Sequence, residues 1–306
     1  MNYLPEGYLI ENEENKNALE NYNSLSEAYR EGRILEARAM VCDHDHNIIV
    51  DLKCMKGVIP REEGALGIRE GTVRDIAIIS RVNRPVSFII KDFIRDPEGK
   101  VTAILSRREA QEKCMAEYIS KLSPGDIIDA KVTHLESFGV FADIGCGIIS
   151  LLPIDLISVS RINHPKERFS VGMNIKAVVQ NKDNGRITLS QKELLGTWKE
   201  NADNFSPGET VAGLIRSIEN YGIFVELAPN LAGLAEYKEN VSTGQQASVY
   251  IKSIIPSRMK IKLIIIETFE HKYTPLPLKY YKSSGHIDNF CYSPKECSKI
   301  IETKFA

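Results

Sequence analysis

Two short stretches of the sequence carry aromatic and acidic residues in nearly the same order. The first runs Phe138-Gly-Val-Phe-Ala-Asp-Ile144, and the second runs Tyr221-Gly-Ile-Phe-Val-Glu-Leu227. Alternate side chains of a β-strand point to opposite faces, so the aliphatic residues of each stretch can share the core face. The alternation then predicts that Phe141 and Phe224 lie on the outer face, beside the aromatic residue that opens each stretch. An exposed aromatic pair on a strand is typical of a surface on which unpaired nucleic-acid bases stack.

The same alternation sends one acidic residue of each stretch, Asp143 or Glu226, to the outer face. Both stretches also follow a glycine and an acidic residue, which begin at Gly125 and at Gly208. The offset is constant, since 222 minus 139 and 208 minus 125 both give 83. Self-similarity at a fixed period indicates a repeated domain.

Composition limits the class of protein. The 306 residues suffice for two or three domains, and 43% hydrophobic with 26% charged residues is ordinary for a soluble globular protein. No apolar run approaches the roughly 20 residues of a membrane helix, so we expect no membrane partner, and we expect no signal peptide. The six cysteines form no CxxC pair, which argues against a zinc ribbon or a disulfide scaffold. A reducing, cytoplasmic setting is therefore expected.

The net charge is 39 minus 41, or −2, whereas a strongly basic domain is the usual mark of nucleic-acid binding. The charges are segregated, however. The first thirty residues are rich in glutamate, and lysines and arginines recur in the later repeats. Binding that depends on base stacking and a few local cations does not need a basic total.

The strand and turn signals predict a mainly β protein, with tandem five-stranded OB-type β-barrels joined by short α-helices. A divergent first barrel is expected over residues 24–106, a second over 125–190 and a third over 208–267. An acidic, flexible and solvated arm precedes them over residues 1–23, and a tail follows over 268–306. The five strands predicted in the first barrel are 36–41, 47–52, 73–80, 86–90 and 101–105.

Helix-start signatures mark the connections. Ser24-Leu-Ser-Glu27 predicts a short helix that ends near Gly32. Ser-x-x-Glu patterns also begin at Ser106 and Ser190, just after the last strand of the first and second barrels. They predict linker helices within the connecting residues, which are 107–124 and 191–207.

Two further segments have no counterpart in the other repeats. The second block holds extra residues at about 158–169, which we expect to form a surface loop. The tail contains Ser293-Pro-Lys-Glu296, which predicts one more capped helix. The sequence suggests no function for this tail.

Several motif pieces occur in a fixed order. The pattern Gly-x-x-x-x-Ala/Gly-x-Val/Ile, then aromatic-Gly-x-Phe, then Gly-Arg-Ile-x-Leu-Ser resembles the S1 RNA-binding domain. Residues 125–131, 138–144 and 185–190 carry it, and the third block repeats most of it. Through Val50-Asp-Leu52 and Gly57-Val-Ile-Pro-Arg-Glu62, the first block resembles the divergent leading domain of bacterial ribosomal S1 proteins. The likeness covers about residues 24–267 and is nearest to the short S1 type of Gram-positive anaerobes.

The resemblance implies a barrel that binds single-stranded RNA on one face through two aromatics, a histidine, an aspartate and a basic residue. In the second barrel the aromatic positions fall on Phe138 and Phe141, and the basic position falls on Arg186. Asp183 lies near the expected acid, one residue out of register. The expected histidine falls on Pro153, so that contact is missing.

In the third barrel the implied aromatic residues are Tyr221 and Phe224. The histidine position falls on Glu236, and the basic position falls on Lys260, with Arg258 as a rival. Two cations on the first strands of the repeats, Lys131 and Arg216, are further outward-facing candidates for phosphate contact.

The first block departs from the family pattern. His46-Asn-Ile-Ile49 stands where the aromatic motif would be, so the usual surface for bases is absent. This favours a structural or protein-docking role for the first barrel.

Other readings of these residues stay open. The four aromatic residues could pack inside the barrels, since aromatic residues are more often core than binding residues. Cys42-Asp-His-Asp-His46 contains metal-ligand types, but its spacing matches no compact zinc motif and it falls at a strand turn. Cys291 and Cys297 with His286 form an equally loose set. We predict no metal and no cofactor, and no catalytic motif is found.

The sequence therefore predicts a non-enzymatic protein that binds single-stranded RNA, above all messenger RNA during translation at the small ribosomal subunit. The second and third barrels would hold RNA, and the first would contact small-subunit proteins. Two other roles compete with this one. The array could deliver RNA to a nuclease or transcription complex, or it could be an interaction scaffold without RNA affinity.

Overall fold

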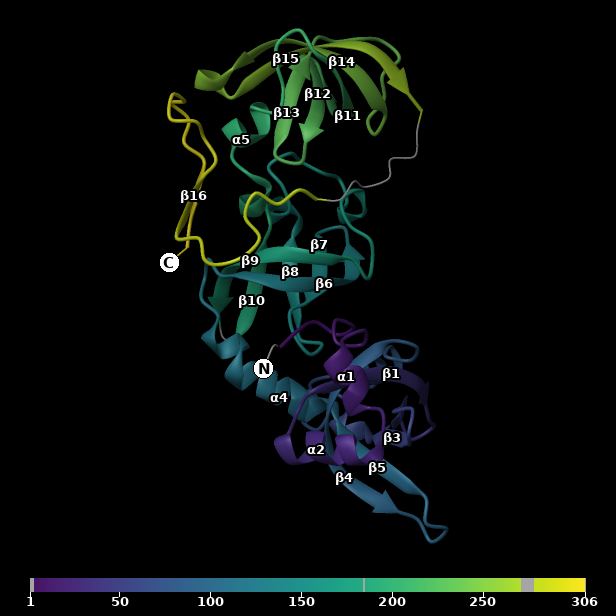
Figure 1. Cartoon of the computed structure of the whole chain (residues 1–306). Helices are drawn as coiled ribbons and strands as arrows, with labels where there is room; N and C mark the ends of the chain where they lie inside the picture. Colours follow the sequence, from purple (N-terminus) through teal and green to yellow (C-terminus); the bar gives the residue numbers. More distant parts are fainter. Residues whose placement is uncertain (1–2, 184, 271–277, 306) are drawn as a thin grey trace. The chain divides into compact units, whose positions relative to one another are not determined.

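The computed structural model describes residues 3–183, 185–270 and 278–305, and these contain three closed five-stranded β-barrels (Figure 1). In each barrel the fifth strand pairs in parallel with the third strand and antiparallel with the fourth. This is the topology of an OB-type barrel. The predicted fold class is confirmed.

Short helices flank the first barrel. Its strands are β1 (Leu35–Cys42), β2 (Ile48–Asp51), β3 (Lys56–Ile59), β4 (Pro85–Arg95) and β5 (Val101–Ser106). The associated helices are α1 (Glu13–Ala18), α2 (Tyr22–Glu31), η1 (Arg61–Glu63), α3 (Ile76–Ile79), α4 (Arg107–Glu117) and η2 (Ile119–Lys121).

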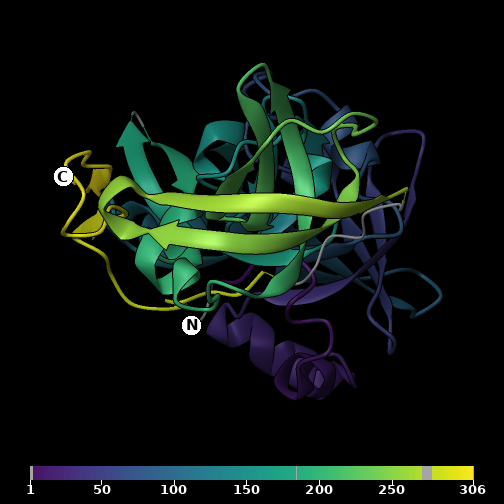
Figure 2. The ribbon, with the colours of Figure 1, turned by 90° about the horizontal axis from the view of Figure 1, so that it is seen from above.

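The second barrel consists of β6 (Ile127–Glu136), β7 (Gly139–Asp143), β8 (Ile149–Pro153), β9 (Asn174–Asp183) and β10 (Arg186–Ser190), with η3 (Ile154–Leu156) and η4 (Pro165–Glu167) after β8. Two helices, η5 (Lys192–Leu195) and α5 (Trp198–Ala202), lead to the third barrel. That barrel consists of β11 (Thr210–Glu219), β12 (Gly222–Ala228), β13 (Leu231–Ala235), β14 (Gln246–Ile255), η6 (Pro256–Arg258) and β15 (Lys260–Phe269). Figure 2 shows β14 and β15 side by side as a long hairpin.

One predicted strand of the first barrel is wrong. Residues 73–80 contain the short helix α3, and the third strand is β3 instead. The helix buries only Ile78 and leaves Ile76 and Ile79 exposed, so this apolar run does not fill a strand of the barrel wall. The hydrophobic pattern that would predict β3 from the sequence is weak, because Gly57 has no side chain. A Cβ there would lie 2.6 Å from the Leu105 side chain, so the packing requires glycine.

Two of the predicted helix ends, at Gly32 and at Ser106, agree with the structure, and the others differ. Helix α2 ends at Gly32, whose φ of 59° suits glycine, although Asn21 rather than Ser24 is its N-cap. Ser106 caps α4 by accepting a hydrogen bond from the Glu109 N–H at 2.9 Å. In the second linker, the α-helix begins later than predicted and is capped by Thr197.

The N-terminal arm is not solvated from residue 3 onward. Tyr3 and Glu6 are buried, and α1 lies against the first barrel. Asn15 makes two hydrogen bonds with the backbone of Glu36, one to its N–H at 2.8 Å and one to its C=O at 2.9 Å. The arm is acid-rich in composition, but its polar side chains satisfy the backbone of a barrel strand.

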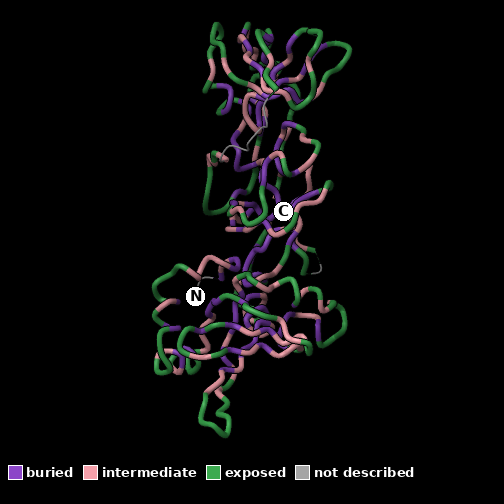
Figure 3. The backbone as a smooth tube through the Cα atoms, turned by 90° about the vertical axis from the view of Figure 1, so that its right-hand side faces the viewer, coloured by how far each residue is buried: buried purple, intermediate pink, exposed green. Residues whose placement is uncertain are grey.

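Contacts between residues divide the chain into two compact units. The first takes in Met1–Leu122, Asp129–Lys131 and Asp143–Ile149, and the second takes in Ser123–Ile128, Val132–Ala142 and Ser150–Ala306. Figure 3 shows buried backbone inside the barrels and exposed backbone at the free end of the β4–β5 hairpin. No helix in the described ranges is long and apolar enough to span a membrane.

The described part of the tail lies along both barrels of the second unit (Figure 1). Ile287 N–H donates to the Gly125 carbonyl at 2.9 Å, and Trp198 N–H donates to the Tyr292 carbonyl at 3.0 Å. The predicted helix at 293–296 does not form, because the Ser293 hydroxyl accepts from the Ile301 N–H instead of capping a helix. The tail folds back as a hairpin of β16 (Asn289–Cys291) and β17 (Glu302–Lys304).

Candidate nucleic-acid interface

The second barrel presents two aromatic rings on its outer face. Phe138 lies just before β7 and is 54% exposed, while Phe141 on β7 is half-buried. Their ring centroids are 6.0 Å apart and the rings are nearly perpendicular, at 89°. The alternate residues Val140 and Ala142 are fully buried in the barrel. The strand therefore sends its aliphatic residues inward and its rings outward, as the alternation predicts.

The third barrel repeats this arrangement. Tyr221 is 66% exposed, Phe224 is half-buried, and their centroids are 6.1 Å apart at 88°. Ile223 and Val225 fill the barrel interior. Each pair thus joins one exposed ring to one half-buried ring at the barrel surface, an arrangement on which bases can stack. We call Phe138 with Phe141, and Tyr221 with Phe224, the two ring pairs.

A histidine that sequence reasoning missed lies beside the first ring pair. The ring centroid of His134, on β6, is 6.3 Å from that of Phe141, and the two planes are tilted by 31°. Its Nε2 contacts the Glu136 carboxylate at 2.7 Å. The family position for histidine falls on Pro153, so a motif search could not find it. Only the pairing of neighbouring strands brings His134 to this surface.

A lysine that sequence reasoning missed lies in line with the second ring pair. Phe224 is the register partner of Leu234, and Leu234 is the register partner of Lys262 on β15. Two strand spacings separate Phe224 from Lys262, or about 10 Å. Lys262 is exposed. The alternation of Lys260 and Lys262 on one strand was a signal that could have revealed it.

The other predicted contact residues lie at hairpin ends. Asp183 and Arg186 face each other where β9 turns into β10, and both are exposed. Arg258 and Lys260 are exposed at the corresponding turn of the third barrel. These positions leave the side chains accessible, and their contact with RNA stays a prediction.

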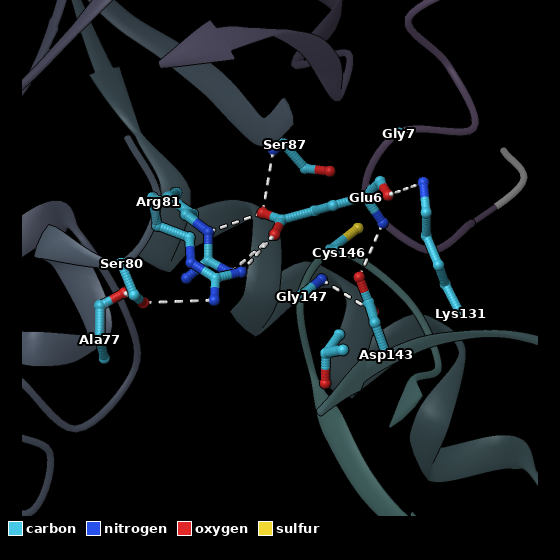
Figure 4. Close-up of polar contacts among 12 residues, drawn as sticks. Glu6, Gly7, Ala77, Ser80, Arg81, Ser87, Lys131, Asp143, Cys146 and Gly147 are labelled. Carbon is cyan, nitrogen blue, oxygen red and sulfur yellow. Dashed lines mark hydrogen bonds and ion pairs between the residues drawn. The ribbon is translucent and has the colours of Figure 1, made fainter. Parts of the chain in front are cut away.

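Lys131 differs from Arg186, Arg258 and Lys260 because the N-terminal arm contacts its side chain. Its Nζ donates to the Glu6 carbonyl at 3.1 Å and lies 5.9 Å from the centre of the Tyr8 ring. Figure 4 shows this contact. The lysine therefore has a structural partner in the first unit, and a phosphate would compete with that partner.

Asp143 is buried, although it faces outward from its strand (Figure 4). Its Oδ2 accepts from the Glu6 N–H at 2.7 Å, and its Oδ1 accepts from the Gly145 N–H at 2.8 Å. Burial, followed by the nearby Glu6 carboxylate, raises the pKa of Asp143 to about 7. The strand alternation placed this acid on the outer face but did not indicate that residues of the N-terminal arm cover it.

Glu6 itself forms a buried ion pair. Its carboxylate accepts from Arg107 Nε at 2.6 Å and from Arg107 Nη2 at 3.0 Å, and Arg81 approaches it at 3.3 Å. Burial alone would raise the pKa of Glu6, but the Coulomb attraction and hydrogen bonds of Arg107 lower it below the ordinary value. The bidentate pair compensates the desolvation of both groups.

Glu226 is the counterpart of Asp143, and it too is buried. It accepts from Arg168 Nη2 at 2.6 Å and from Arg216 Nε at 2.7 Å. Arg216 also pairs with Glu167. Arg216 is therefore not an outward cation free for phosphate. Arg168 comes from the extra segment at 158–169, which contacts the third barrel through this ion pair.

The first barrel has no ring pair at the matching position. Ile49 on β2 is half-buried, and His46 occupies the preceding turn with a φ of 63°. Asp43 organises this turn by accepting from the Asn47 N–H at 2.8 Å and from the Asp45 N–H at 3.0 Å. The acidic residue thus has a structural role, and no group of three or more metal-ligating side chains occurs among the described residues.

Comparison with known proteins agrees with this geometry. Residues 121–192 match the model of the S1 RNA binding domain. The small ribosomal subunit protein bS1 of Staphylococcus aureus (strain MRSA252) is 30% identical over 261 residues, which cover 72% of this chain and 66% of that protein. This chain belongs to the S1 family. The matched region consists of the second barrel, which carries the first ring pair, and a few flanking residues.

Two more S1 relatives show the extent of the likeness. The bS1 protein of Staphylococcus epidermidis (strain RP62A) is 32% identical over 66% of this chain and 59% of that protein. The bS1 protein of Rhizobium meliloti (strain 1021) is 28% identical over 73% of this chain and 41% of that protein. The chain thus spans between 41% and 66% of the length of these three relatives.

Proposed function

We propose that this S1-family chain binds single-stranded RNA on the outer faces of its second and third barrels. The observation that carries the proposal is the pair of matched, exposed ring pairs, repeated at an offset of 83 residues. Stacking on aromatic side chains contributes about 1–3 kcal/mol per base and tolerates any sequence, because every base has a π-face. Phe138, Phe141, Tyr221 and Phe224 would bind bases.

Cations near the rings would contact the backbone of the RNA. Arg186 in the second barrel, and Arg258, Lys260 and Lys262 in the third, are exposed on or beside the strands that complete the two faces. Both faces belong to one unit, so binding at the first raises the effective concentration of RNA at the second. Two weak sites can then give useful affinity without a basic total charge.

The names of the relatives support a proposal for the biological setting. Their name places them in the small ribosomal subunit. We propose that this chain binds messenger RNA during translation there, in the cytoplasm, and that its first barrel contacts small-subunit proteins. The first barrel lacks a ring pair, which supports the proposal that it contacts protein while the other two barrels bind RNA. The proposal assigns no catalytic step to any residue.

A titration of single-stranded RNA at two salt concentrations tests the proposal. Each phosphate contact releases counterions, so the dissociation constant should rise steeply with salt. Some RNA affinity should remain at high salt, because base stacking is not electrostatic. If a labelled RNA shows no binding even at low salt, the chain is an interaction scaffold and the proposal is wrong.

A further inference from the structure

The turn between the second and third strands is covered by other parts of the chain in two barrels and open in the first. In the second barrel, β7–β8 turn residues contact segments that precede the barrel. The Cys146 N–H donates to the Leu4 carbonyl at 2.9 Å, and Gln111 of α4 donates to the Cys146 carbonyl at 3.2 Å. Together with the Glu6–Asp143 bond, these contacts bury the turn (Figure 4).

The β12–β13 turn of the third barrel is covered in the same way. Asn230, fully buried, accepts from the Val159 N–H at 3.0 Å and donates to the Gly196 carbonyl at 2.8 Å. The Pro229 carbonyl accepts from the Ser160 N–H at 3.1 Å. Here too the covering residues come from outside the barrel. The turn therefore works as a repeated docking point for polypeptide backbone.

The β2–β3 turn of the first barrel has no such cover. Asp51 matches Asp143 and Glu226 in position, but it is exposed, and its carboxylate accepts only from the Lys53 N–H within its own turn, at 2.9 Å, among the described residues. Cys54, which matches Cys146, is exposed as well. The acidic position that is buried in the other two barrels, by the Glu6 N–H in one and by arginine side chains in the other, is exposed here.

A cavity of about 330 Å³ lies at this open turn, lined by Tyr22, Cys54, Met55, Arg95, Lys100 and Val101. Tyr22 is 47% exposed, and its ring packs against that of Phe93 with centroids 5.1 Å apart. Arg95 and Lys100 are exposed and form no ion pair within the described chain. The lining thus combines the side chains of Tyr22, Met55 and Val101 with two cations, and it includes no acidic residue.

We propose that this open turn is the site where the first barrel binds another protein, through an extended segment with an acidic side chain. Backbone N–H groups of the segment would bind Asp51, as the Glu6 N–H binds Asp143. Its carboxylate would pair with Arg95 and Lys100, and an apolar side chain would fill the cavity. This inference rests on the proposed protein contact of the first barrel and gives it a location and a chemistry.

Photo-cross-linking and sedimentation test the site. The full chain, with p-benzoylphenylalanine in place of Cys54, is irradiated with purified small ribosomal subunits. A cross-link from position 54 to a subunit protein is expected. A cross-link to RNA only, or to a second copy of this chain, would overturn the proposal.

Charge-reversal variants provide a second test of the site. Arg95→Glu combined with Lys100→Glu should weaken sedimentation with small subunits about tenfold or more, because two interfacial ion pairs become repulsive. Arg74→Glu with Arg84→Glu, also exposed on the first barrel, is the matched control and should leave binding unchanged.

The possible outcomes distinguish a failure of the proposed site from a failure of the proposed function. Equal binding of the reversed variant and the wild type would overturn the site alone. If the wild type itself fails to bind subunits, the proposed ribosomal role and the site fail together. A titration with single-stranded RNA should give the same affinity for both charge-reversed variants, and a selective loss of RNA affinity in Arg95→Glu/Lys100→Glu would assign the cavity to RNA instead.

Discussion

Asp143 and Glu226 occupy the same position in the second and third barrels, 83 residues apart, and each is buried by a residue from earlier in the chain. Asp143 accepts from the Glu6 N–H, and Glu226 accepts from Arg168. The repeat therefore conserves more than a ring pair. It also conserves, on the same strand, an acidic residue that joins the barrel to what precedes it.

Glu226→Ala should destabilise the second unit. The substitution would leave Arg168 and Arg216 buried without their shared carboxylate, and removal of one partner from a buried ion pair costs about 3–5 kcal/mol. Urea unfolding followed by the fluorescence of Trp198 would measure the loss, since this residue lies in the core of the third barrel.

Arg168→Met is the informative comparison. It removes one cation but leaves the Arg216–Glu226 pair intact, and the methionine can fill much of the vacated volume. We expect a clearly smaller loss of unfolding free energy than for Glu226→Ala. Equal losses would show that the cost lies in packing rather than in uncompensated charge.

Glu36 should make stability depend on pH. It accepts from the Gly7 and Leu9 N–H groups at 3.0 Å, yet burial dominates and raises its pKa from 4.5 to about 7. The native state therefore keeps a proton that the unfolded chain has lost. The free energy of unfolding should fall as pH rises from about 4.5 to about 7, and then level off.

Glu36→Gln isolates this effect. The amide oxygen can accept both N–H bonds, and its NH₂ group can donate to the Ser87 hydroxyl, which now lies 3.1 Å from the carboxylate. Chemical denaturation at about pH 5 and about pH 8 should show a flatter dependence than the wild type, with a difference of up to about 3 kcal/mol. Identical slopes would contradict a raised pKa at this site.

Tyr280 should anchor the tail to the second barrel. Its hydroxyl accepts from the Lys176 N–H at 3.1 Å and from Gln191 Nε2 at 3.0 Å. Tyr280→Phe leaves these donors without that acceptor, at a cost of about 1–3 kcal/mol. Hydrogen exchange should accelerate at Lys176. Tyr237→Phe, at an exposed ring, is the control and should change neither stability nor exchange.

The sequence predicted the fold where the patterns were local. Strand alternation identified the inward and outward residues of β7 and β12, and capping signatures placed α4 and the end of α2. Local patterns also misled: an apolar run at 73–80 resembled a strand, and the capping pattern at 293–296 does not begin a helix. A short barrel strand with a central glycine, β3, had too little hydrophobic signal to compete.

The candidate site was harder to predict where contacts are long-range. The alternation of side chains along a strand describes one barrel at a time. It placed Asp143, Glu226 and Arg216 on outer faces, but it could not show that other segments of the chain bury them. His134 and Lys262 join the ring pairs through strand pairing, which no linear motif records. Residues that meet across barrels or strands become visible only once the chain is folded.

The most direct test of the account is the affinity of Phe141→Ala/Phe224→Ala for a single-stranded RNA, measured by fluorescence anisotropy beside the wild type. The loss of one ring from each pair should weaken binding by at least about 2 kcal/mol, while circular dichroism confirms folding. Ile49→Ala, at the matching position of the first barrel, should leave the affinity nearly unchanged. A folded double variant that binds RNA as tightly as the wild type would contradict base stacking on these two barrels.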